Sequence, residues 1–327
     1  MLPSPPSAPL EASGRRRPSP SPGCAAAAGR AVAIALALLL SALAPAIGAQ
    51  PVVRADERLA FDRPEAWAMR YYAAVSLASG FGVPAARRPG SLDLALEVGW
   101  IPSLEGDEAR VGFRGTKEED LDKAPLLARP RLTIGLPARA SLELGWVPPI
   151  EVFDAEPNLV TLAVGRPILE GGTWRAGVRL HGQTGVIRSD ITCPGEVAAR
   201  GNDPDANPFG CEAPSRDEVH LSYYGVEVST ERDAGGAWVP YLGVGVSRLD
   251  LEFQVDARTG GFRDLSRLTA SGSQWHAVAG LRWLGAERSD LAFEVFYSPL
   301  SVERRSGAGA ETDALLNLRT MLRYRLR

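Results

Sequence analysis

Lysine is almost absent from this chain of 327 residues, which carries its positive charge on arginine. The formal net charge is −3, so the protein as a whole has no general attraction for nucleic acid. The sequence also lacks a phosphate-binding loop, a dinucleotide fingerprint, an HExxH helix and a G-x-S-x-G turn. We therefore expect no cofactor, no metal ion and no nucleic-acid partner.

Long hydrophobic runs are missing as well. The one extended run, Ala31 to Leu43, has about 13 residues, fewer than the roughly 20 that a membrane-spanning helix needs. Arg30 precedes it, and the small residues Ala44 to Ala49 follow it. This pattern is typical of a secretory signal peptide, which we expect over residues 1–49 with a long disordered N-terminal region; the alternative is a membrane-anchoring helix. The mature chain then begins near Gln50, and any membrane residence must come from β-strands.

The strongest pattern in the mature chain is its last stretch, Ala314 to Leu326. Leu316, Leu318 and Leu322 fall on one face of this stretch, while Arg319 and Arg323 fall on the other. A period of two over about ten residues predicts a β-strand with one apolar and one polar face, long enough to cross a bilayer at a tilt.

Similar alternation recurs along the chain and predicts eleven clear strands and one weak one. The clear strands cover residues 69–79, 91–100, 132–136, 142–146, 159–168, 174–183, 218–229, 238–255, 268–284, 290–303 and 314–326, and weaker signals lie at 58–62 and 109–113. Short turns at 137–140, 170–173, 231–236 and 285–289 alternate with mostly longer loops at 102–123, 193–217, 257–266 and 304–312.

Short turns at one end and long loops at the other are the arrangement of an outer-membrane barrel. We predict an all-β protein with a single antiparallel transmembrane β-barrel of about twelve strands, within a range of ten to fourteen, over residues 67–327. Residues 50–66 are expected to form a periplasmic arm or a weak first strand. The long loops are expected to be extracellular and the short turns periplasmic.

The alternation leaves open which face of the strands is inside. A soluble secreted β-barrel is the alternative, because it would alternate with its apolar face inward. Most tryptophans lie near predicted strand ends, as in the aromatic belts at the two membrane boundaries, and this favours the membrane barrel. These residues are Trp67, Trp100, Trp146, Trp174, Trp238 and Trp283.

The polar face of the strands is then the lining of the lumen. The residues expected to face solute are Glu97, Arg131, Glu143, Arg175, Arg179, His181, Arg282, Glu294, Arg319 and Arg323. The same parity assigns Arg248, Asp250 and Glu252 to the interior. Such residues either form charge rings that select solutes in a pore or pair with one another in a closed network, because buried charges need partners.

One long loop holds the two cysteines that remain after signal cleavage, Cys193 and Cys211. In an oxidising compartment they are expected to form a disulfide. The loop also holds Asn202, Asp203, Asp205 and Asn207, whose oxygens suit calcium; however, their spacing matches no EF-hand, and these residue types are ordinary in loops.

A catalytic site is the remaining alternative. His220 and Ser222 are neighbours on one predicted strand, and a Ser/His pair at the outer rim would indicate a lipid-modifying enzyme. The histidine followed by Asn-Gly-Gly and serines that marks phospholipase-type barrels is absent. We therefore expect no enzymatic activity.

Together, the signal sequence, the alternating strands and the asymmetry of the loops resemble bacterial outer-membrane β-barrel proteins of the porin-like type. The resemblance covers roughly residues 66–327 and is one of architecture, without a shared motif. It implies a location in the outer membrane of a Gram-negative bacterium, with membrane lipids and the barrel-assembly machinery as partners. The expected function is a passive channel or binding pore for small solutes, and the alternatives are a structural barrel with a closed, salt-bridged interior or a lipid-modifying enzyme.

Overall fold

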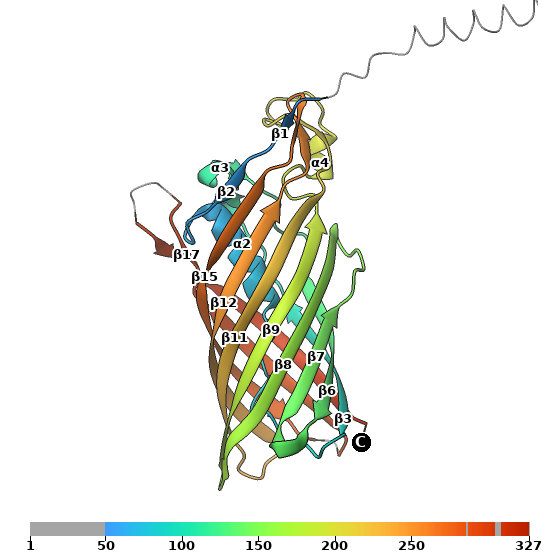
Figure 1. Cartoon of the computed structure of the whole chain (residues 1–327), viewed down its shortest axis with the longest axis vertical. Helices are drawn as coiled ribbons and strands as arrows, with labels where there is room; N and C mark the ends of the chain where they lie inside the picture. Colours follow the sequence, from blue (N-terminus) through green and yellow to red (C-terminus); the bar gives the residue numbers. More distant parts are fainter. Residues whose placement is uncertain (1–49, 286, 305–308, 327) are drawn as a thin grey trace, which may run out of the picture. The chain divides into compact units, whose positions relative to one another are not determined.

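A closed antiparallel β-barrel of ten strands forms the body of the protein, which we describe from a computed structural model covering residues 50–285, 287–304 and 309–326 (Figure 1). The barrel strands are β3 (Leu92–Trp100), β6 (Leu126–Gly135), β7 (Ser141–Val147), β8 (Ala155–Gly171), β9 (Trp174–Ser189), β11 (Asp217–Arg232), β12 (Trp238–Gln254), β15 (Arg267–Trp283), β16 (Ser289–Ser298) and β19 (Leu315–Arg325).

Each barrel strand pairs with its neighbours in chain order, and β19 closes the wall against β3. Between β11 and β12 the ladder runs without a break from Glu218 opposite Gln254 to Glu231 opposite Tyr241. Ten of the eleven predicted strands form this wall. The expected count of twelve is therefore too high, although ten lies at the lower limit of the predicted range.

The segment 69–79, predicted as a strand, is instead the second half of a helix and its continuation. Helix α2 (Pro64–Ser76) begins with proline at its first turn, where the missing N–H costs nothing, and twelve of its thirteen residues are buried. A helix that is apolar on all sides belongs in a core, and here the barrel surrounds it. The wall thus begins at Leu92 and not at residue 67, because residues 64–84 lie inside the barrel.

The outer face of the barrel is apolar around its middle. Large hydrophobic side chains are exposed there on every barrel strand, among them Leu96, Leu162, Leu180, Val244, Leu281 and Leu318. Exposed aromatic residues mark two levels: Trp174, Trp238 and Trp283 near the short turns, and Trp100, Trp146, Tyr224 and Trp275 near the long loops. This is the surface of a membrane-spanning barrel. Trp67 does not belong to it, because it is buried in α2.

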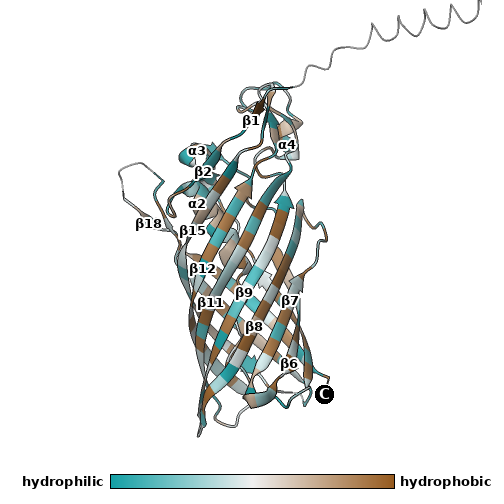
Figure 2. Cartoon of the chain, viewed as in Figure 1, coloured by the Kyte–Doolittle hydropathy of each residue, from teal (hydrophilic) through white to brown (hydrophobic). Residues whose placement is uncertain are grey.

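The long strands reverse their amphipathic character near the long-loop end. On β12 the outward residues are apolar from Trp238 to Val246 and then polar at Arg248, Asp250 and Glu252, whereas Leu249 and Leu251 point inward and are buried. The interior assignment of Arg248, Asp250 and Glu252 is therefore wrong. These three residues lie on the same outward face as Trp238 and Val246. They are polar because the top of this strand stands above the apolar belt (Figure 2), and the inner face of the strand packs on α2 there.

Smaller elements cover the long-loop end. A four-stranded sheet joins β1 (Val52–Val53), β14 (Phe262–Asp264), β13 (Ala257–Thr259) and β10 (Cys211–Ala213), and a short helix α4 (Gly195–Ala198) lies in the loop before β10. β2 (Asp56–Arg58) pairs in parallel with the start of β15. The pairs β4 (Arg110–Val111) with β5 (Lys117–Glu118) and β17 (Ser301–Val302) with β18 (Glu311–Thr312) complete the structure, with short turns at Gly106–Glu108, Gly112–Gly115 (α3) and Pro137–Arg139.

Of the two expectations for residues 50–66, the periplasmic arm does not fit this arrangement, whereas the weak first strand agrees in part, because β2 pairs with β15. Val52 and Asp56 belong to strands that pair at the long-loop end, opposite the short turns. From there the chain runs through the barrel as α2 and emerges at the short-turn end, where β3 begins (Figure 1). Residues 1–49, for which a signal peptide is expected, lie outside the described residues. Among the described residues, no helix is long and apolar enough to cross a membrane.

Candidate functional site: the plugged lumen

The lumen is filled by residues 64–84, which we call the plug and which comprise α2 and the extended segment after it. The last carbonyl groups of a helix have no partner within the helix. Arg319 of the wall supplies one, because its guanidinium donates to the carbonyl oxygens of Leu77 (2.5 Å) and Ala74 (2.9 Å). The same guanidinium lies flat over the ring of Phe296, 3.8 Å from its centroid.

Three further wall arginines bind carbonyl groups at or just beyond the helix end. Arg129 donates to Ser76, Arg179 to Ala78 (2.7 Å) and Arg131 to Ser79 (2.7 Å). Positive charge is favourable at the C-terminus of a helix, where the peptide dipoles leave partial negative charge. The arginines of the lumen therefore hold the plug by its backbone.

Two carboxylates pair with Arg129, Arg131 and Arg179. Glu97 accepts hydrogen bonds from Arg129 (3.2 Å) and Arg131 (2.9 Å), and Glu143 accepts from Arg131 (3.1 Å) and Arg179 (2.6 Å). Buried charges are tolerated when they are paired and hydrogen-bonded, and this chain of alternating sign meets that condition.

Other carboxylates bind the N–H groups of the plug. Glu227 accepts from the backbone of Gly80 (3.0 Å), and Glu231 accepts from Val83 (3.4 Å). A Cβ at position 80 would lie 2.7 Å from the Glu227 carboxylate, which would then have to shift, so glycine allows this close approach. The plug is thus fastened through both its donors and its acceptors.

Two buried histidines and a buried tyrosine complete the lining. His276 contacts Glu227 through Nε2 at 3.2 Å, and His181 contacts Ser247 at 3.0 Å. The hydroxyl of Tyr223 accepts from the backbone N–H of Ala78 at 3.0 Å. Together these contacts leave the wall and the plug joined along the length of the extended segment.

All ten residues predicted to face the lumen lie on inward positions of the wall: Glu97, Arg131, Glu143, Arg175, Arg179, His181, Arg282, Glu294, Arg319 and Arg323. Six of them contact the plug or one another: Glu97, Arg131, Glu143, Arg179, Glu294 and Arg319. His181 contacts Ser247, Arg175 and Arg282 bind Glu231, and Arg323 pairs with Asp290 at the short-turn end. Their role in facing solute stays a prediction.

Arg129 is a lumen residue that the sequence interpretation missed. It is fully buried and bonds both the plug and Glu97, yet the predicted strand began only at residue 132. Pro130 usually interrupts a strand. Here Pro130 lies on the outward face of β6. Arg129 has the same parity as Arg131, and this was the signal that could have identified Arg129 as inward.

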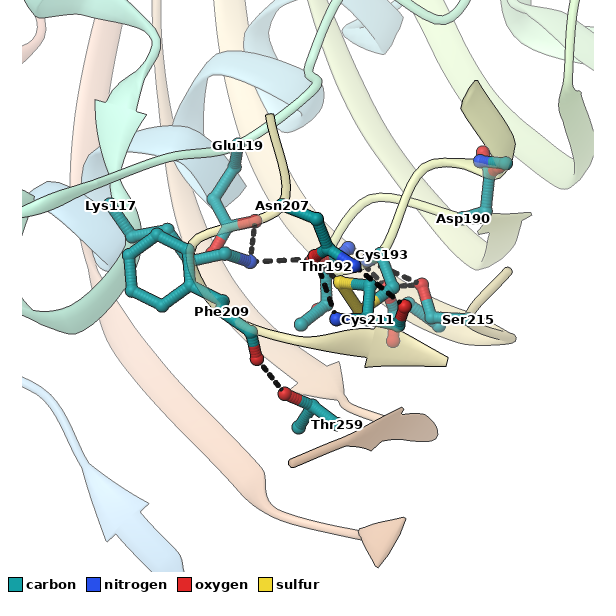
Figure 3. Close-up of a disulfide and its surroundings, with 12 residues drawn as sticks. Lys117, Glu119, Asp190, Thr192, Cys193, Asn207, Phe209, Cys211, Ser215 and Thr259 are labelled. Atoms are coloured by element: carbon teal, nitrogen blue, oxygen red, sulfur yellow. Dashed lines mark hydrogen bonds and ion pairs between the residues drawn. A yellow bond between two sulfur atoms is a disulfide. The ribbon is translucent and has the colours of Figure 1, made fainter. Parts of the chain in front are cut away.

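The long loop contains the expected disulfide between Cys193 and Cys211, with Cα atoms 5.6 Å apart (Figure 3). Its polar residues act within the loop: Asn207 bonds the backbone of Gly201 and Cys211, and Asp203 accepts from two backbone N–H groups that follow it. In the described parts of the chain there is no cluster of three or more His, Cys, Asp or Glu residues arranged to hold a metal ion.

His220 and Ser222 both lie on the outward face of β11, above Tyr224. Each has a different partner: the Nε2 of His220 contacts Glu218 (3.1 Å), and the hydroxyl of Ser222 contacts Thr184 (3.1 Å). The pair is thus located at the rim, but its hydrogen bonds are not those of a nucleophile and its base.

Comparison with known proteins identifies the barrel and nothing finer. No protein-family model matches the chain, and no curated protein sequence is similar to it. Among solved structures, an outer membrane channel of Pseudomonas putida F1 is 10% identical with a TM-score of 0.41, covering 77% of this chain and all of the other. The toluene transporter TodX of Pseudomonas putida is 12% identical with a TM-score of 0.33, covering 78% of this chain and 74% of the other.

The outer membrane protease OmpT of Escherichia coli is also similar, at 6% identity and a TM-score of 0.34, covering 72% of this chain and 94% of the protease. Channels and a protease appear side by side in these comparisons, and every TM-score is low, so they carry no argument about function. The chain resembles bacterial outer-membrane β-barrel proteins in its closed antiparallel barrel.

Proposed function

We propose that the protein is an outer-membrane barrel that serves as a gated conduit or binding pore for small solutes and that the plug closes it at rest. A barrel of eight strands can be filled by its own side chains, whereas a wider one leaves a lumen. With ten strands, this barrel has room for a helix, and α2 occupies that room. A passive, permanently open channel does not fit this geometry.

One observation carries the proposal beyond a purely structural barrel. The wall closes by strand pairing from β3 round to β19 without using the plug, which is held by side-chain hydrogen bonds and apolar packing and not by a strand ladder. The plug can therefore move without breaking a ladder of the wall. In the alternative, a structural barrel, the same contacts would hold the plug permanently.

The test is single-channel conductance of the refolded mature chain, from Gln50 onward, in a planar bilayer. We expect the wild-type protein to insert without stable open steps and the double variant Arg129→Ala/Arg319→Ala to show them, because it removes the groups that bind the helix end. Arg232→Ala, at an exposed position of the same wall, is the control.

Stable conductance of the wild-type protein would overturn the closed resting state. A folded double variant that stays silent would favour the structural barrel. In a conducting variant, Arg179→Glu should move the ion preference towards cations, because Arg179 faces the lumen beside Glu143.

A further inference from the structure

A cavity of about 390 Å³ lies at the long-loop end, separate from the charged network around the plug. Ligand pockets range from about 300 to 1,000 Å³, and an engineered void of about 150 Å³ already binds benzene. The cavity therefore has room for a molecule of about two fused rings.

The lining is mainly apolar and comes from four parts of the fold. Helix α2 contributes Ala68, Met69 and Tyr72; the loop before β6 contributes Val111 and Leu121; and Ile191 lies beside them. The tops of the long strands contribute Val219, Phe253 and Leu268. This apolar chamber exists because the strands reverse their amphipathic character above the membrane belt and turn apolar side chains inward.

A flap formed by residues 109–119 covers one side of this cavity. Its Phe113 and Arg114 have positive φ angles of 47° and 62°, and the exposed ring of Phe113 stacks on Phe209 with centroids 5.8 Å apart. Within the flap, the backbone at Gly112 lies close to the carboxylate of Glu119, and a side chain at position 112 would collide with that carboxylate.

Glu119 is the polar group at the base of the flap. Its Oε2 binds the ammonium of Lys117 (2.7 Å), which also donates to the carbonyl oxygen of Thr192 (2.5 Å; Figure 3). Burial, opposed by Lys117 and reinforced by the nearby carboxylates of Asp217 and Glu65, raises the pKa of Glu119 to about 7. The carboxyl group can accept a hydrogen bond from a ligand inside the cavity.

The charges around the cavity disfavour an anion. Four carboxyl groups line it, those of Glu57, Glu65, Glu119 and Asp264, against the guanidinium groups of Arg63 and Arg114. The ammonium of Lys117, paired with Glu119, is a third cation, which leaves a surplus of one carboxylate. Arg63 is already engaged by Glu57 (2.5 Å) and Glu65 (2.7 Å). A carboxylate ligand would meet an acidic surplus in a partly desolvated site.

We propose that this cavity binds a small, uncharged, largely aromatic or alicyclic molecule whose single hydroxyl group donates a hydrogen bond to Glu119. The apolar lining supplies most of the affinity, and the acidic rim excludes carboxylates of the same shape. Binding here does not require the plug to move, so this site stands or falls independently of the conduit.

The experiment is calorimetric titration of the folded mature chain in detergent micelles with 2-naphthol and with 2-naphthoate, which has the same ring system but an anionic head. We expect 2-naphthol to bind once per chain and 2-naphthoate to bind at least about tenfold more weakly near pH 8. Ala68→Phe, which fills the cavity from α2, should weaken 2-naphthol binding by about tenfold or more.

Ala279→Phe is the matched control, because it adds the same ring on the outer face of β15 and should leave binding within about twofold. If Ala68→Phe does not fold, Leu268→Trp fills the same space from the wall. Equal heats from the wild-type, cavity-filled and control proteins would mean that the probe only partitions into micelles, and this would overturn the site. Tighter binding of 2-naphthoate would overturn the assigned ligand class.

Discussion

Arg319 illustrates why arginine, and not lysine, holds the plug. Its planar guanidinium reaches two backbone carbonyls of the plug while one face covers the ring of Phe296. Lysine offers a point charge without the flat surface and the fork of donors. At this position an ammonium group could therefore replace only part of what the guanidinium does.

Arg319→Ala should destabilise the barrel by about 2–4 kcal/mol, because the buried carbonyl of Leu77 would lose its side-chain donor and that of Ala74 would keep only the backbone N–H of Leu77. Arg319→Lys should recover part of this loss. The free energy of unfolding in urea, measured for micelle-bound protein, checks the prediction against the exposed control Arg232→Ala. A loss no larger than that of the control would show that Arg319 does not hold the plug.

Glu119 gives the protein a specific dependence on pH. Its carboxyl has a pKa of about 7 in the folded chain and an ordinary value of 4.5, so the folded state keeps a proton that the unfolded state has lost. The free energy of unfolding should therefore be highest below about pH 4.5 and fall by up to roughly 3 kcal/mol as the pH rises through 7.

Unfolding measured at about pH 5 and about pH 8 tests this, with Glu119→Gln as the comparison. The difference between the two conditions should be smaller in the variant, because an amide does not titrate. An identical pH dependence in both proteins would assign the effect to other carboxyl groups, such as Asp122, whose pKa is also raised by burial.

At the scale of elements, the periodicity of the sequence predicted the wall strands but missed the helix α2. The alternation identified all ten wall strands because each passes between lipid and lumen, so its two faces meet opposite environments. The stretch Met69 to Ser79 also alternates well and was predicted as a strand, but α2 is buried on every side and needs no polar face. Its alanines, and Pro64 at its start, were the available helix signals.

The sheet of β1, β14, β13 and β10 and the loop that holds α4 form a cap over the long-loop end. This cap depends on the disulfide. Cys193 and Cys211 join the loop before α4 to β10, whose partner is β13. Closing a loop of this length contributes about 3 kcal/mol, mainly by restricting the unfolded chain. The wall below is paired independently of this link.

Cys193→Ser/Cys211→Ser should therefore loosen the cap and leave the barrel folded. Limited proteolysis should cut the variant within residues 190–216 faster than the wild-type chain, while the slower-migrating heat-denatured form on gels should appear at a similar temperature. Loss of barrel folding in the variant would show that the disulfide acts beyond the cap.

For the whole molecule, the reversal of amphipathic character divides the protein into two regions. One is a membrane barrel with a polar, arginine-rich lumen; the other stands above the belt and has the opposite organisation, with Leu221, Leu249 and Leu251 packed inside. On β11 the charged residues Glu227 and Glu231 point inward within the barrel, whereas Glu218 points outward above the belt, so charge changes face between the two regions. Assigning one polar face to a whole strand missed this change. The level of Tyr224 and Trp275 was the sequence signal for that boundary.

Two outward positions of β12 test this division directly. Val244 and Asp250 are both exposed on the same face and six residues apart, about 20 Å along the strand. In liposomes, a membrane-impermeant maleimide should label Asp250→Cys and spare Val244→Cys, whereas a fluorophore on Val244→Cys should be quenched by nitroxide-labelled lipid. The native cysteines of the mature chain are paired in the disulfide, so each variant adds one free thiol. The outward charge of Asp250 is costly in hydrocarbon, so this position is expected above the belt. Lipid quenching at both positions would place the whole strand in the bilayer and would overturn the division into two regions.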